Sequence, residues 1–258
     1  MAILKVLSAS TIRGDSVENP QGEDLGNIED IMIDLDRGMV AYTVLSFGGV
    51  LGIGDKYFAI PWDALRIKPG EHKFIVNIDK EKLENASGFD KDDWPRSEEK
   101  THIEHVNRIF KYYGYKPYWE RVRETPSEKE TSTRGTRISA LAVSDIEGKS
   151  IENPQGEDLG NIEDIMIDLD RGMVAYTVLS FGGVLGIGDK YFAIPWDALR
   201  IKPGEHKFIV NIDKEKLKNA PGFDKDNWPR SEEKVHREVN RISEYYGYKP
   251  YWEYLLSP

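Results

Sequence analysis

The sequence predicts a mainly β protein made of two tandem small antiparallel β-barrels, each followed by a C-terminal helical, aromatic tail. The first observation is an internal repeat, because Glu18 to Leu83 recurs without a change as Glu152 to Leu217. The second is a series of short apolar runs separated by turn signals, which is typical of a barrel or a sandwich. The third is a change to helical spacing of the apolar residues near the end of each copy.

The internal repeat also predicts the domain organisation. We expect the first domain at residues 1–123 and the second at residues 137–258, each of a size that can close its own core. Residues 124–136 lack large apolar side chains, so we expect an exposed, flexible linker between the domains. An identical stretch of this length gives little information about function. The differences between the copies lie in the first strand, the helical tail and the C-terminal end.

Within the first copy, the strands follow from alternation and from β-branched and aromatic residues. The expected strands are residues 31–35, 40–47, 57–62 and 74–78. A turn signal at residues 19–22 precedes them, and Asp36 to Gly38 forms a tight turn between the first two. Pro61 should lie at an edge or bulge, because proline cannot donate a hydrogen bond to a sheet. Strict alternation would place Asp34 and Asp36 together on the solvent-facing side of their strand.

The tail of each copy has the pattern of helices. Asp79 can cap a short helix over residues 80–85, and Ser97 can cap a second helix. The apolar residues that follow recur at steps of three and four, which predicts one apolar face: Ile103, Val106, Ile109 and Tyr113. Gly114 and Pro117 should end this helix.

The order of these motifs resembles the PRC-barrel family, which is named for the cytoplasmic domain of the photosynthetic reaction-centre H subunit. The residues that carry the resemblance are Pro20–Gly26, 28–36, Val40–Gly49, Leu51–Lys56 and Ala59–Trp62, with the tail motifs Gly88–Pro95 and Tyr112–Trp119. The tail looks like the stand-alone prokaryotic branch, often described as stress-related. The resemblance implies a mostly antiparallel barrel, usually without known enzymatic activity.

The same resemblance implies a role in protein contacts. Relatives cap a membrane photosystem, assist maturation of the small ribosomal subunit by binding a ribosomal protein, or join archaeal cell-division assemblies. We expect neither the membrane anchor of the H subunit nor the separate N-terminal domain of the maturation factor in this chain. A ribosome-maturation-type adaptor therefore remains only a distant alternative, because fold alone does not fix function.

Composition limits the classes of partner. The net charge of −10 disfavours binding to nucleic acid and to anionic membranes, since both carry negative charge. The chain has no cysteine, which excludes disulfides, thiolate nucleophiles and cysteine-based zinc sites. The first residues do not have the pattern of a signal peptide, and no apolar run reaches the length of a membrane helix. We expect a cytoplasmic protein with no direct membrane insertion.

Two clusters could suggest a ligand. The glycine-rich stretch Gly48 to Gly54 leads into an expected strand, whereas a phosphate-binding loop leads into a helix, so we expect a hairpin connection. Asp90, Asp92 and Asp93 lack the glycine and the closing glutamate of an EF-hand loop. We expect these acids to be solvated or to cap a helix, with weak cation binding as the alternative.

The sequence offers no catalytic constellation. His102 and His105 have helical spacing for a metal pair, but the second copy has only His236 in this region. No nucleophile signature is present. We therefore expect no enzyme, no catalytic or metal-binding residues and no cofactor.

Aromatic residues at the end of each copy are the best candidates for a functional role. They are Trp94, Tyr112, Tyr115, Tyr118 and Trp119, with Trp228, Tyr245, Tyr248, Tyr251 and Trp252 in the second copy. Tyrosine and tryptophan are favoured anchors in interfaces. The simpler alternative is that Trp94, Tyr113 and Trp119 cover an open end of their own barrel. A third possibility is that the two copies exchange their tails.

These observations predict a non-enzymatic interaction or assembly module. We expect the two copies to pack together within the chain as a pseudo-dimer, that is, as two repeats associated like the subunits of a dimer. The protein partner is unknown, and the chain could also form a homo-oligomer. The alternative function is a module that binds or senses a small ligand or a cation.

Overall fold

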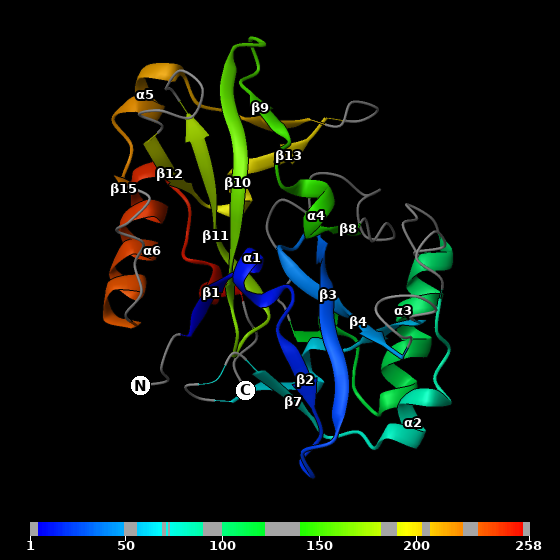
Figure 1. Ribbon diagram of the computed structural model, residues 1–258. Helices are drawn as coiled ribbons and strands as arrows, with labels where there is room; N and C mark the ends of the chain where they lie inside the picture. Colours follow the sequence, from blue (N-terminus) through cyan, green and yellow to red (C-terminus); the bar gives the residue numbers. More distant parts are fainter. Residues whose placement is uncertain are drawn as a thin grey trace. The chain divides into compact units, whose positions relative to one another are not determined.

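The computed structural model divides the chain into two compact units that do not follow the repeat boundaries (Figure 1). The first-repeat unit comprises Thr11–Val143 with Leu256–Pro258, and the second-repeat unit comprises Met1–Ser10 with Ser144–Leu255. The structure describes residues 5–48, 56–68, 71, 73–89, 100–121, 140–181, 190–202, 207–223 and 232–254. The expected linker, residues 124–136, lies outside this part of the chain. Each unit therefore takes a short segment from the other repeat.

The first-repeat unit is built around one sheet. Its strands are β2 (Ser16–Glu18), β3 (Asp24–Asp34), β4 (Met39–Phe47), β5 (Lys56–Ile60), β6 (Leu65–Ile67), β7 (Lys73–Val76) and β8 (Ala140–Ala142). They pair in the order β6–β7–β2–β3–β4–β5, and β8 pairs with β3 beyond the end of β2. All these pairs are antiparallel except β2 with β7, which is parallel. The sheet is therefore mixed.

The expectation of closed antiparallel barrels is wrong, although the mainly β class is confirmed. Among the described strands, no pairing joins β5 to β6, so the sheet of the unit stays open. The physical reason lies between these two strands. Pro61 follows β5 directly and has no N–H to continue the ladder, as expected, and the chain then turns through a 3-10 helix, η1 (Trp62–Ala64). This turn ends one strand before the next can pair with it.

The second-repeat unit has the same plan. Its strands are β1 (Val6–Ser8), β9 (Ser150–Glu152), β10 (Asp158–Asp168), β11 (Met173–Phe181), β12 (Lys190–Ile194), β13 (Leu199–Ile201), β14 (Phe208–Val210) and β15 (Gly222–Phe223). They pair in the order β13–β14–β9–β10–β11–β12–β15, and β9 with β14 is the parallel pair. A 3-10 helix, η5 (Trp196–Ala198), follows β12. The identical sequences have thus formed the same sheet twice.

The long strand β3 explains why one sequence prediction failed. Asp34 was expected on the solvent-facing side, but its side chain is completely buried. The pairing of β3 with β4 shifts register between Met32 and Ile33. Such a bulge breaks the strict alternation on which the prediction depended. As a result Ile31, Met32, Ile33 and Asp34 are all buried, and only Asp36 remains exposed as expected.

Helices complete each unit. The first-repeat unit has α2 (Lys80–Glu84), α3 (Lys100–Tyr113) and a 3-10 helix, η2 (Tyr118–Arg121); the second has α5 (Lys214–Lys218), α6 (Glu232–Tyr246) and η6 (Tyr251–Tyr254). The Asp79 side chain accepts a hydrogen bond from the Lys82 N–H, which confirms the predicted cap. Gly114, at φ 80°, ends α3 as predicted. None of the described helices is long and apolar enough to span a membrane.

The side of helix α3 that is buried is the apolar face predicted from its periodicity. Val106, Phe110 and Tyr113 are buried, and Ile103 and Ile109 are half-buried. Figure 1 shows α2 and α3 next to each other at one end of the first-repeat unit. Ser97, the predicted cap of this helix, lies outside the described residues. The tail therefore belongs to the folded body of its unit.

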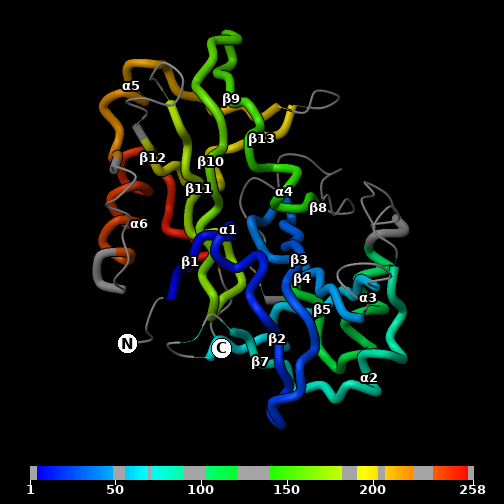
Figure 2. Tube along the Cα trace, in the orientation of Figure 1, coloured from blue at the N-terminus to red at the C-terminus, as the bar shows by residue number. Residues whose placement is uncertain are grey.

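The short N-terminal segment of each repeat pairs with the other repeat. Strand β1 pairs antiparallel with β10, with Leu7 opposite Ile167. Strand β8 pairs in the same way with β3, with Leu141 opposite Ile33. The chain path in Figure 2 shows β1 beside β10 within the second-repeat unit. Each unit is thus completed by a strand from the repeat that forms the bulk of the other unit.

Candidate interaction surfaces

A buried carboxylate fixes the aromatic tail of the first-repeat unit. Asp34 accepts a hydrogen bond from the hydroxyl of Tyr118 at 2.8 Å and one from Arg37 Nη1 at 3.1 Å. It also accepts hydrogen bonds from the backbone N–H groups of Asp36 and Arg37, both at 3.0 Å. The backbone bonds are those of an aspartate that begins a tight turn. A buried carboxylate needs such partners, because burial without them would cost several kcal/mol.

The second-repeat unit has the same anchor. Asp168 accepts hydrogen bonds from the Tyr251 hydroxyl at 2.6 Å and from Arg171 Nη1 at 2.8 Å. Burial, together with the negative charge of Asp168, raises the pKa of Tyr251 above its ordinary value. The tyrosine therefore stays protonated and remains a donor to the carboxylate. Sequence patterns did not single out this Asp–Tyr pair, because its members are far apart in the chain.

The outer side of each tail combines a lysine with two tyrosines. Tyr112 donates a hydrogen bond from its hydroxyl to the Lys82 carbonyl at 2.7 Å. Lys82 Nζ lies 5.8 Å from the ring centre of Tyr112 and 6.0 Å from that of Tyr113. These distances are those of a cation–π interaction. The second repeat has the same arrangement, in which Tyr245 donates to the Lys216 carbonyl at 2.6 Å. The contact joins the two helices of the tail in both units.

The tails differ where the two sequences differ. In the second repeat the His236 ring stacks on Trp252, with ring centres 4.7 Å apart and planes at 13°. Ile103 holds the equivalent position in the first repeat, three residues before Val106. Tyr254 also forms a hydrogen bond with Asp197, whose pKa is raised by burial and lowered in part by this bond. The region predicted to distinguish the copies is therefore part of the tail surface.

The residues proposed from sequence as interaction anchors fall into three groups. Tyr118 and Tyr251 are buried in their own units. Tyr112 is 40% exposed, and the others in the described part are half-buried: Tyr115, Trp119, Tyr245, Tyr248 and Trp252. Trp94 and Trp228 lie outside the described residues. The tails lie on their own repeats, so the exchanged segments are the N-terminal strands and not the tails.

The candidate ligand clusters lie largely outside the described residues. Most of the glycine-rich stretch and the acidic residues Asp90, Asp92 and Asp93 lie outside the described residues. His105 is half-buried, and burial together with the nearby Arg108 lowers its pKa. Nothing is described of the His102 side chain. Within the described part of the chain, no group of three histidine or acidic side chains could hold a metal ion.

The exchanged N-terminal strand is held by a polar contact that sequence patterns did not reveal. Ser10 donates hydrogen bonds from its N–H and its hydroxyl to the two carboxylate oxygens of Asp164, at 3.3 and 2.5 Å. Asp164 is buried on β10, so the bond satisfies a carboxylate that would otherwise lose its hydration. A signal was present in the sequence: Ser10 and Ser144 are one of the few identical pairs in a segment where the two copies differ at many positions.

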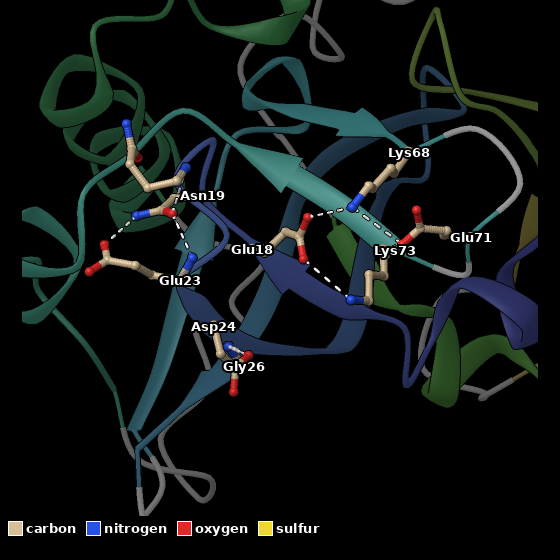
Figure 3. A network of polar contacts seen from close by, with 9 residues as sticks. Glu18, Asn19, Glu23, Asp24, Gly26, Lys68, Glu71 and Lys73 are labelled. Carbon is tan, nitrogen blue, oxygen red and sulfur yellow. Dashed lines mark hydrogen bonds and ion pairs between the residues drawn. The ribbon is translucent and has the colours of Figure 1, made fainter.

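A glutamate on β2 contacts a lysine on β7 and the lysine that directly follows β6, on one side of the first-repeat unit (Figure 3). Glu18 forms ion pairs with Lys68 at 3.0 Å and with Lys73 at 3.3 Å. Lys68 forms a second ion pair with Glu71 at 3.3 Å. Asn19, the next residue, is buried and accepts hydrogen bonds from the N–H groups of the following turn. The expected turn after β2 is therefore organised from its first residue.

The lysine pair predicts a pH-dependent contribution to stability. Hydrogen bonds from Lys68 and Lys73 lower the pKa of Glu18. In the second repeat, hydrogen bonds from Lys202 and Lys207 lower the pKa of Glu152. Because the folded-state pKa is depressed, this stabilisation is present above about pH 4.5, the ordinary value, and is lost as the pH falls below it. We expect the stability difference between the wild type and a Glu18→Gln/Glu152→Gln variant to shrink as the pH falls from about 5 to about 3.

Denaturant unfolding monitored by circular dichroism at a series of pH values measures this difference. Glu84→Gln, which removes an exposed carboxyl group from α2, is the matched control. A difference between wild type and double variant that stays constant over the acid range contradicts the proposed role of the two glutamates.

Comparison with known proteins identifies the two repeats. A search among curated proteins finds no match. The family model of the PRC-barrel domain matches residues 5–83 and again residues 139–217. Each match includes the N-terminal strand that pairs with the other repeat. Two family domains in tandem, covering more than half of the chain, show that this protein belongs to the PRC-barrel family, as the order of its motifs predicted.

Proposed function

We propose that this chain is a non-enzymatic assembly module: an intramolecular pseudo-dimer of PRC-barrel domains that presents two aromatic tails to a protein partner. The chain contains two domains of a family that is generally non-catalytic. The tails are the part of each domain where partly exposed aromatic side chains lie next to positions that differ between the repeats. Two similar surfaces in one chain allow a partner to bind at one tail or at both.

The observation that carries the pseudo-dimer is the pairing of β1 with β10 and of β8 with β3. Each family match begins with the exchanged segment, so each domain lends its own first strand and borrows the equivalent strand of the other. Such reciprocal exchange is a common way to form a dimer at little energetic cost. In a fused chain, the tether raises the effective concentration of the two halves. This supports a permanently associated pair.

The tails are favoured as the binding surface because contacts within each unit fix the positions of their aromatic side chains. Each tail is fixed from inside by a buried tyrosine, while Tyr112 and Tyr245 contact lysines on the outer side. Aromatic rings held in place lose little conformational entropy when a partner binds, which makes them good anchors. Lys82 and Lys216 add a positive charge beside each anchor. We therefore expect a partner surface with apolar and acidic groups.

Affinity capture with crosslinking from the native host tests this proposal. We expect a Tyr112→Ser/Tyr245→Ser variant to recover at least about tenfold less of the specific partner than the wild type, the loss typical of a binding hot spot. The matched control is Ile201→Ser, because Ile201 is also 40% exposed but lies on β13. Equal recovery by the tail variant, with its circular dichroism spectrum unchanged, would overturn the assignment of the tails.

A further inference from the structure

The two strand edges that receive the exchanged segments are chemically identical. Strands β3 and β10 both lie inside the stretch that the two repeats share without a change. The registers are also equivalent, with Leu7 opposite Ile167 and Leu141 opposite Ile33. Neither edge can therefore distinguish β1 from β8 by sequence. Connectivity of the chain, and not the receiving surface, determines which strand pairs with which edge.

The exchanged strand β1 makes all its described pairings over a short stretch of β10. Three residues pair with Met166 to Asp168, and the Leu169 N–H donates a hydrogen bond to the Lys5 carbonyl at 2.8 Å. Ser10 then binds the carboxylate of Asp164. The side chains of the strand are only half-buried. Although Ala9 is completely buried, the strand itself pairs through only three described residues near one end of the chain, and such a terminal segment can open locally without unfolding the rest of the unit.

We propose that β1 also pairs in trans with a second copy of this chain. In this arrangement, residues 5–10 of one chain occupy β10 of another, and the second chain returns the same segment to the first. This inference rests on the strand exchange of the proposed function. The hydrogen bonds and side-chain contacts are the same in both arrangements, so the balance depends on effective concentration. Exchange within one chain prevails in dilute solution, and the dimer accumulates when chains refold at high concentration.

The absence of cysteine from the chain makes a direct test possible. Residues directly opposite each other in an antiparallel pair have β-carbons within reach of a disulfide. Chains that carry only Leu7→Cys are mixed with size-tagged chains that carry only Ile167→Cys. The mixture is unfolded, refolded at about 1 µM to about 1 mM, and oxidised. We expect a disulfide-linked mixed dimer whose fraction rises at least about tenfold over this range.

Two controls separate the possible outcomes. Leu7→Cys mixed with Ile201→Cys measures random collision, because Ile201 is exposed and has no register with β1; an equal yield of dimer in this mixture overturns the proposal. No mixed dimer at any concentration also overturns it, provided that the Leu7→Cys/Ile167→Cys chain forms its internal disulfide. If a Leu7→Cys/Ile33→Cys chain forms the internal disulfide instead, the strand pairs with its own repeat, and the pseudo-dimer of the proposed function fails as well.

A measurement on the unaltered chain covers the case in which cysteine variants do not fold. The wild type, refolded at high concentration and then diluted, should show by native mass spectrometry a dimer that returns to monomer only slowly. Only monomer under these conditions contradicts the proposal without any substitution.

Discussion

Replacement of Asp34 by alanine should destabilise the first-repeat unit by about 3–5 kcal/mol, the usual cost of breaking a buried charged pair. The reason is the number of groups that depend on this completely buried carboxylate. The Tyr118 hydroxyl and the Arg37 guanidinium both lose their acceptor, and so do two backbone N–H groups of the turn. We expect Tyr118→Phe, which removes only one of these bonds, to cost about 1–3 kcal/mol.

Denaturant unfolding measures both effects, and the second repeat supplies the matched control. Asp168 makes the same contacts with Tyr251 and Arg171, so Asp168→Ala should have an effect of similar size on the second-repeat unit. Hydrogen exchange followed by mass spectrometry assigns each loss to its unit. A change below about 1 kcal/mol for Asp34→Ala would mean that this carboxylate does not hold the tail.

Replacement of Gly26 by alanine should have an effect of comparable size for a different reason. Gly26 lies in β3 with φ at 102°, and an added β-carbon would come within 1.9 Å of the Ser46 carbonyl oxygen. That oxygen belongs to the backbone of the neighbouring strand, so it cannot move aside like the end of a flexible side chain. We expect a loss of about 4 kcal/mol or more, which is exceptional for so small a substitution.

Gly22 provides the control that separates backbone conformation from crowding. It also has a positive φ, 81°, but an added β-carbon would meet no atom within 4 Å. Gly22→Ala should therefore cost only about 1–2 kcal/mol, the price of a left-handed conformation for a residue with a side chain. Thermal unfolding of both variants tests the comparison. If the two substitutions have equal effects, the close approach of β3 to β4 does not constrain the fold.

Local rules were sufficient for those parts of the fold that depend on neighbouring residues. Asp79 caps its helix, Gly114 ends the long helix, and Pro61 follows directly after the end of β5. In each case the cause lies within about four residues of the effect, so one sequence contains the information. The strand predicted at residues 31–35 overlaps only the end of β3, which begins at Asp24 and ends at Asp34. The alternation of its faces was wrong, because the bulge depends on pairing with β4.

The parts that sequence analysis missed depend on contacts between distant residues. Tyr118 binds Asp34 and Ser10 binds Asp164, and no periodicity relates the members of either pair. The strand exchange was hidden for a second reason. Because β3 and β10 have the same sequence, a sequence pattern cannot show which of these two strands pairs with β1. The exchange could be recognised only from the register of the sheet.

The exchange of N-terminal strands has a consequence for how the duplicated gene product can change. A substitution at Leu7 acts on a strand pairing of the second-repeat unit, and one at Leu141 acts on the equivalent pairing of the first. Neither half can therefore diverge, shorten or be lost without an effect on the stability of the other. The two repeats are therefore expected to evolve together, although each has its own copy of the domain sequence.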